Sequence, residues 1–156
     1  MNTMAPTRPT QLQVCRVRLA AEPAAAPEAR SQVLAAIRAW DVPVDPGLAV
    51  LLTSELVTNA IRHEPGQTVT VAITCFLGQL RVDVHDTSRS WPVLVEAPAD
   101  AETGRGLMLV ATLSDTWGLY RTPAGKAVYF TLAFQHDLAE SGGRGLQGFT
   151  RGDCES

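Results

Sequence analysis

The segment LLTSELVTNAIRH, residues 51–63, combines an apolar helical pattern with three polar residues, Glu55, Asn59 and His63, spaced four apart. In an α-helix this spacing places the three on one narrow stripe, with about 40° between neighbours. Apolar residues occupy much of the remaining circumference, so the stripe is not simply the solvent side of an amphipathic helix. A buried carboxylate and a buried amide need partners, because burying either one alone is costly.

Two interpretations of this stripe are open. A Mg²⁺ ion with a phosphate chain would satisfy both groups, because Asn59 offers a hard oxygen and Glu55 could orient or deprotonate a nucleophile. Arg62 and His63, at the helix end, could then meet phosphate charge or the helix dipole. Alternatively, Glu55 pairs with an arginine and Asn59 bonds to a neighbouring loop.

Two further segments favour a nucleotide. Asp86 ends the strand-like run LRVDVHD, where a carboxylate can accept from an exocyclic amine such as that of adenine, or can simply start a turn. The segment TGRGLMLV, residues 103–110, leads glycines into an apolar helix whose free N–H groups can bind phosphate, and Arg105 adds planar donors. GRGL recurs at residues 143–146 with no strand before it and no apolar helix after it, which indicates tail composition.

The hydrophobic periodicity predicts the elements that must position these residues. Asp45 is a good N-cap, with Pro46 as the first residue of the helix that carries the stripe. Leu77-Gly78-Gln79 and Pro123-Ala124-Gly125 are plausible hairpin turns. We expect strands at 11–20, 68–76, 80–86, 116–121 and 126–134, and helices at 25–40, 46–63 and 104–113.

This order predicts an α+β fold, a two-layer sandwich in which a mixed, mostly antiparallel sheet carries helices on one face. We expect residues 1–10 to be a flexible arm, residues 11–135 to form the domain, and the Gly-rich residues 136–156 to be a disordered tail. Residues 87–103 have no clean period, which is typical of a lid or binding loop.

Composition narrows the function classes. The 156 residues carry a net charge of −3 and no run of Lys or Arg, so direct nucleic-acid binding is not expected. No stretch approaches the roughly 18 apolar residues that span a bilayer, and the first ten residues lack an apolar signal core, so we expect a cytoplasmic protein without membrane contact. Cys15, Cys75 and Cys154 are scattered and odd in number, which predicts neither a disulfide framework nor a zinc cluster.

Together, the segments SELVTNAIRH, VDVHDTSRS, TGRGLMLV and GKAVYFTL resemble the GHKL superfamily, the histidine-kinase-like ATPases of the Bergerat fold. Within it, they look most like the bacterial anti-sigma factor serine/threonine kinases. The resemblance covers about residues 12–134 and three boxes in the family's order. It implies ATP and Mg²⁺ as cofactors, a sigma factor and an anti-anti-sigma (STAS-like) protein as partners, and a possible homodimer.

The resemblance also implies roles for individual residues. Glu55 is the general base, Asn59 the Mg²⁺ ligand, and Asp86 the acceptor of the adenine amine, while residues 87–103 form the ATP lid. The residues expected to contact the nucleotide are Asn59, Arg62, His63, Asp86, Ser88, Gly104, Arg105, Gly106 and Leu107.

The chain departs from the family pattern at two places. Ser88 and Ser90 stand where the superfamily often has glycines, and Gly125-Lys126-Ala127 stands where many relatives place an adenine-binding threonine. Two functions are therefore predicted. One is a kinase that phosphorylates a serine of the anti-anti-sigma partner and sequesters a sigma factor. The other is a non-catalytic ATP-binding module that acts by sequestration alone.

Overall fold

The computed structural model describes residues 11–63, 66–89, 102–135 and 150–151. Its elements are, in chain order, β1 (Gln13–Ala20), α1 (Ala25–Ala39), α2 (Pro46–His63), β2 (Thr68–Phe76), β3 (Gln79–Asp86), α3 (Glu102–Leu113), β4 (Thr116–Arg121), β5 (Lys126–Ala133) and β6 (Thr150–Arg151). The predicted order of strands and helices is confirmed, and α3 begins two residues earlier than predicted.

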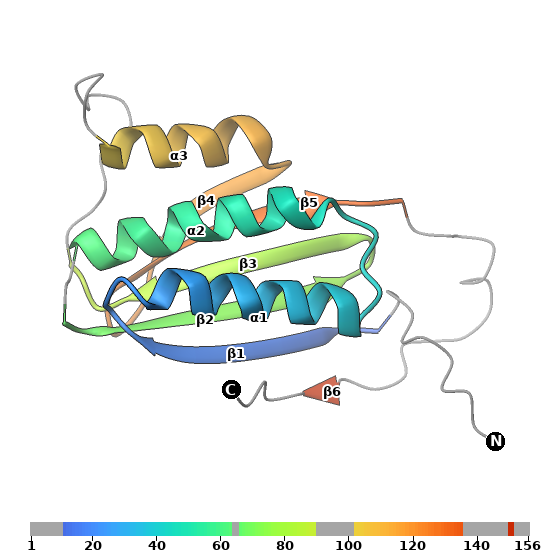
Figure 1. Ribbon diagram of the computed structural model, residues 1–156, viewed down its shortest axis with the longest axis horizontal. Coiled ribbons are helices and arrows are strands. Elements are labelled where there is room, and N and C mark those ends of the chain that lie inside the picture. The colour runs from blue at the N-terminus through green and yellow to red at the C-terminus, as the bar shows by residue number, and fades with distance from the viewer. Residues whose placement is uncertain (1–10, 64–65, 90–101, 136–149, 152–156) are drawn as a thin grey trace.

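The strands form one sheet in the order β4-β5-β3-β2-β1-β6. Neighbours from β4 to β1 pair antiparallel, and the two-residue β6 pairs parallel with β1. All three helices lie on one face of the sheet, with α2 between α1 and α3 (Figure 1). The predicted two-layer α+β sandwich is therefore confirmed. Within the described residues, no helix is long and apolar enough to cross a membrane.

Local sequence explains where α2 begins and where α1 ends. Asp45 caps α2, because its Oδ1 accepts from the Gly47 N–H at 2.9 Å, and Pro46 takes the first helical position. After α1, Asp41 adopts a left-handed φ of 52°, and the Val42 N–H donates to the Ile37 carbonyl at 2.9 Å. This is a Schellman ending, here without the usual glycine.

The β2–β3 hairpin is tighter than predicted. Phe76 pairs with Gln79, so only Leu77 and Gly78 form the loop and Gln79 belongs to β3. Both loop residues have positive φ, 47° at Leu77 and 76° at Gly78, which is the pattern of a type I′ turn.

The core lies between the sheet and the helices. Alternate residues of β3 and β5, among them Val82, Val84, Val128 and Phe130, are buried there against apolar residues of the helices.

The buried thiol of Cys75 is free, and burial raises its pKa to about 11. Cys15 is disulfide-bonded, so the expectation of no disulfide is wrong for this residue. Spacing along the chain does not report which cysteines approach one another in the fold.

The predicted arm at 1–10 lies outside the described residues. So does most of the predicted tail from 136 onwards, of which the structure describes only β6.

Candidate functional site

One end of the sandwich gathers the residues singled out by the sequence. There α2 and β3 end, while α3 and β5 begin (Figure 1). The antiparallel register fixes part of this meeting, since Asp86 at the end of β3 pairs with Lys126 at the start of β5. Residues that are far apart in the sequence are thus brought to one edge of the fold.

Asn59 is the buried polar residue of α2 that the helix itself does not satisfy. Its side chain is 4% exposed, and its Oδ1 has no hydrogen-bond partner among the described residues. By contrast, Thr53 and Ser54 donate to the carbonyls four residues earlier, at 2.8 and 2.9 Å. A buried oxygen without a donor costs stability, so Asn59 Oδ1 is suited to an added ligand. The alternative interpretation, a bond from Asn59 to a neighbouring loop, is not found for this oxygen in the part of the chain that the structure describes.

Glu55 lies one turn before Asn59 and faces α3. It is half-buried and makes no ion pair within the described part of the chain, so the predicted alternative of an arginine partner is not found there. A β-carbon built on Gly106 would lie 2.7 Å from Glu55 Oε2, well inside van der Waals contact. The missing side chain at Gly106 is therefore what allows α3 to approach the carboxylate.

The earlier start of α3 changes the predicted phosphate loop. The first four N–H groups of a helix lack intrahelical partners, and here they belong to residues 102–105, which include Gly104 and Arg105. Gly106 and Leu107 lie in the next turn, and the Leu107 side chain is packed in the core at 1% exposure. Leu107 thus anchors α3 to the core, whereas the side chain of Arg105 lies outside the described atoms.

Arg62 and His63 are the last two residues of α2. Arg62 is exposed there and has an interaction with another group. The His63 side chain is outside the described atoms, so its predicted place beside phosphates stays a prediction.

Asp86 is held by two kinds of donor. Its Oδ1 accepts from the Ser88 N–H at 2.8 Å, which is the turn-starting role weighed from the sequence. In addition, Lys126 Nζ donates to Oδ1 at 3.0 Å and to Oδ2 at 2.9 Å. Beside this pair, Thr87 Oγ1 is a second buried oxygen with no partner among the described residues.

Lys126 is the residue that sequence reasoning left without a role. The sequence does show that Lys126 is in phase with Val128, Phe130 and Leu132, the residues that β5 contributes to the hydrophobic core. A lysine in the buried phase of a strand needs a counter-charge, and Asp86 is the carboxylate that the β3–β5 register places opposite it. Finding the pair required that register, which the sequence does not supply.

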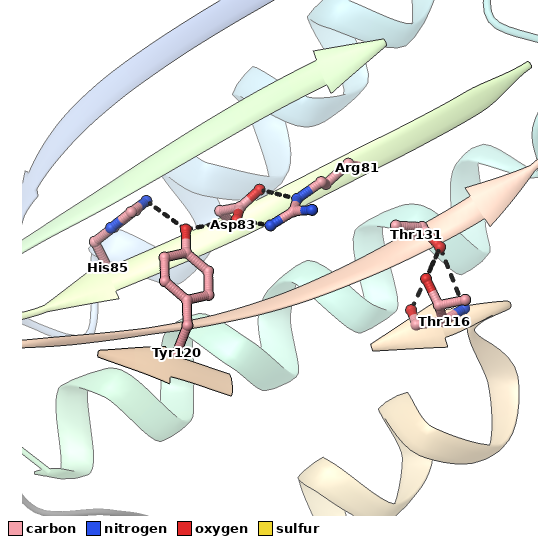
Figure 2. A network of polar contacts seen from close by, with 6 residues as sticks. All are labelled: Arg81, Asp83, His85, Thr116, Tyr120 and Thr131. Carbon is pink, nitrogen blue, oxygen red and sulfur yellow. Dashed lines mark hydrogen bonds and ion pairs between the residues drawn. The ribbon is translucent and has the colours of Figure 1, made fainter. Parts of the chain in front are cut away.

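A second polar network occupies the opposite face of the sheet and does not touch this site. Arg81 and Asp83 form a bidentate ion pair at 2.8 Å, and the Tyr120 hydroxyl donates to Asp83 at 2.8 Å (Figure 2). The Arg81 guanidinium also stacks 3.9 Å above the Tyr129 ring. Burial and the bond to Asp83 raise the pKa of Tyr120 to about 12. Arg81, Asp83 and Tyr120 thus bond to one another on the face of the sheet that no described helix covers.

The fold and the site together define a class of protein: an α+β sandwich that has at one end an amide oxygen without a partner among the described residues, a carboxylate one turn away and a strand-end aspartate. The model of the histidine kinase-like ATPase domain family matches residues 19–132, and the chain therefore belongs to this family. This confirms the family predicted from the sequence.

Among solved structures, the RsbU and RsbW domains of Rv1364c from Mycobacterium tuberculosis share the fold, with a TM-score of 0.55 and 18% identity. The match covers 76% of this chain and 32% of that one, so this chain spans about a third of the length of its structural neighbour. No curated protein gives a significant match.

Proposed function

We propose that the chain is a cytoplasmic anti-sigma regulatory factor that binds Mg-ATP and phosphorylates a serine of an anti-anti-sigma protein. In this proposal it also holds a sigma factor until the partner displaces it. The family supports a nucleotide site, and the fold likeness to a structure that includes an RsbW domain supports the regulatory branch. The observation that carries the proposal is the buried Asn59 Oδ1, which has no hydrogen-bond partner within the described ranges and lies one helical turn from Glu55.

The donor set at this end suits a Mg²⁺ ion that the substrate completes. Mg²⁺ is usually held by one or two protein oxygens, with substrate phosphates and water filling the other positions. Asn59 Oδ1 supplies such an oxygen, and no cluster of three acidic, histidine or cysteine side chains offers a full cage within the described residues. When bound, the ion would neutralise charge on the phosphates.

Glu55 has the chemistry to act on the attacking group. Phosphoryl transfer depends mainly on positioning and charge stabilisation, so a carboxylate that orients the serine hydroxyl and accepts its proton is sufficient. The serine oxygen forms the new bond to the γ-phosphorus as the bond to ADP breaks. Gly106 leaves the Glu55 carboxylate room on the α3 side, and the free N–H groups at residues 102–105 can receive the phosphates.

Calorimetry with ATP, with and without Mg²⁺, tests the binding half of the proposal. Wild type is expected to bind ATP more tightly with Mg²⁺, and Asn59→Ala to lose that dependence because the amide oxygen is gone. Ser54→Ala is the matched control: Ser54 is also a polar residue of α2, but it bonds to Val50 and to Arg30 of α1. ATP affinity that ignores Mg²⁺ and survives Asn59→Ala would contradict the proposal.

Transfer of labelled phosphate to an anti-anti-sigma protein tests the catalytic half. Glu55→Ala is expected to abolish transfer while ATP binding is retained. Binding without transfer in the wild type would instead support the second candidate, a module that sequesters a regulator without catalysis. The Asp86–Lys126 pair favours keeping this second candidate, because it occupies the carboxylate assigned to adenine.

A further inference from the structure

Lys126 is the only lysine in the chain, and it is buried. It is 1% exposed, and its ammonium lies 2.9 and 3.0 Å from the two oxygens of Asp86, which is itself 5% exposed. Twelve other cationic residues are all arginines, whose planar fork differs from the compact ammonium present here. The base end of the site therefore contains a buried, charge-neutral pair where the proposed function needs a free acceptor.

Most of the acceptor capacity of Asp86 is already used. A carboxylate has about four lone-pair positions, and three are taken by the Ser88 N–H and by the two contacts of Lys126. The turn before β5 packs closely against the backbone of Asp86, because a β-carbon on Gly125 would lie 2.2 Å from the Asp86 carbonyl oxygen. The lysine backbone therefore has little room to withdraw.

An adenine amine would have to share Oδ2 with this ammonium, or displace it. Both donors would bond to the same carboxylate, but the amine is neutral, whereas the Lys126 ammonium carries a full positive charge and adds ion-pair attraction to its hydrogen bonds. Displacing Lys126 would also leave a buried ammonium without its counter-charge, which is strongly unfavourable. A base with a carbonyl at the same position faces no such conflict, because Lys126 retains a third N–H that can donate to it.

We propose that Lys126 occupies the base-recognition carboxylate, so that the site binds purine nucleoside triphosphates with little preference for a 6-amino over a 6-carbonyl group. This inference rests on the proposed function, because it assumes that nucleotides bind at this end of the sandwich. Lys126 is then a specificity-determining residue, and the phosphates supply most of the affinity.

A calorimetric comparison of Mg-ATP, Mg-GTP, Mg-ITP and Mg-tripolyphosphate on the full chain tests the inference. The wild type is expected to bind the three nucleotides within about threefold of one another, since the hydrogen bond to a charged group that would separate them is not formed. Lys126→Thr frees Asp86, so preference for ATP over ITP is expected to rise by roughly tenfold or more, the value of one such bond. Lys126→Arg keeps the charge and is expected to stay unselective.

The comparison of nucleotide affinities in the wild type tests the inference even if Lys126→Thr does not fold. A wild-type preference for ATP of about thirtyfold or more would overturn the inference, because it requires a strong bond from the adenine amine. If no nucleotide and no tripolyphosphate binds, the proposed function fails, and the inference with it. Acylation of the single ε-amine gives a second readout: Lys126 is expected to stay unreactive in the ATP complex, and labelling that increases on ATP binding would contradict the persistence of the pair.

Discussion

The carboxylate of Glu55 on α2 lies against the backbone of Gly106 on α3, so closely that a β-carbon at residue 106 would stand 2.7 Å from Glu55 Oε2. Gly106 lies inside a regular helix, so conformational freedom is not the reason for a glycine there. The reason is space for the carboxylate. Because the start of α3 overlaps the end of the predicted lid, a displacement of α3 would move the backbone that lies against the proposed general base.

The substitution Gly106→Ala is expected to reduce phosphate transfer without reducing stability. Alanine is favoured over glycine in a helix interior by about 1 kcal/mol, so the free energy of unfolding is expected to stay near the wild-type value or to rise. The added methyl group displaces Glu55, and misplacing a catalytic group by about 1 Å can reduce the rate by roughly a hundredfold. Urea unfolding and phosphate transfer, measured on the same samples, check both expectations.

Gly47→Ala is the control for this substitution. Gly47 also lies in a helix, and its added β-carbon would be 3.3 Å from Asp45 Oδ1, far from Glu55 in the fold. It is expected to leave transfer unchanged. If Gly106→Ala transfers phosphate at the wild-type rate, Glu55 does not need its present position.

The sequence was sufficient where local rules dominate. Asp45-Pro46 marked the start of α2, and the alternation around Phe130 marked β5, because caps and periodicity act within a few residues. The stripe Glu55–Asn59 could be read from helical spacing for the same reason. These features needed no knowledge of what packs against them.

What could not be predicted depends on tertiary register. The ion pair between Asp86 and Lys126 joins residues forty positions apart and appears only once β3 and β5 are aligned. The opposition of Glu55 and Gly106 likewise needs the packing of α2 on α3. Glu55, Gly106 and Asp86 were all predicted as site residues from the sequence, but the contacts around them depend on elements whose relative positions the sequence does not supply.

Gly125→Ala is expected to destabilise the base end of the site. The new methyl group would lie 2.2 Å from the Asp86 carbonyl oxygen, which belongs to backbone and cannot rotate away. Overpacking of this kind typically costs about 1–3 kcal/mol of unfolding free energy. Ala124→Ser, at the exposed neighbouring position, is the control and is expected to match wild type in thermal unfolding. Equal stability of the two variants would mean that the turn can shift freely.

Leu77→Asn is expected to stabilise the fold by about 0.5–1 kcal/mol, because asparagine adopts the left-handed backbone of a type I′ turn more readily than leucine. Leu77 has a φ of 47° and is 61% exposed, so little buried apolar area is lost. Leu77→Ala keeps a β-carbon at the same left-handed φ but lacks the polar side chain that makes asparagine tolerant of it, so no comparable gain is expected. Chemical denaturation of the three proteins measures the difference, and equal midpoints for all three would contradict the prediction.

His85 is expected to make the fold less stable as the pH falls. Burial lowers its pKa below the ordinary value of 6.5, while Asp83 and Asp86 oppose this shift and Arg16 and Arg81 add to it. The folded state therefore binds a proton less readily than the unfolded chain, so stability present above pH 6.5 is lost as the pH falls through the folded pKa. The Tyr120 hydroxyl, 3.4 Å from Nε2, donates to Asp83 and so can accept from the neutral imidazole.

The measurement is the free energy of unfolding of wild type and His85→Gln at about pH 7.5 and about pH 5.5, either side of an ordinary histidine pKa. Glutamine keeps a polar side chain at this position and does not titrate, whereas every other titratable group is common to both proteins. The wild type is expected to lose more stability than the variant over this interval. An equal loss in both would show that the charge on His85 does not matter to folding, and a larger loss in the variant would reverse the sign of the linkage.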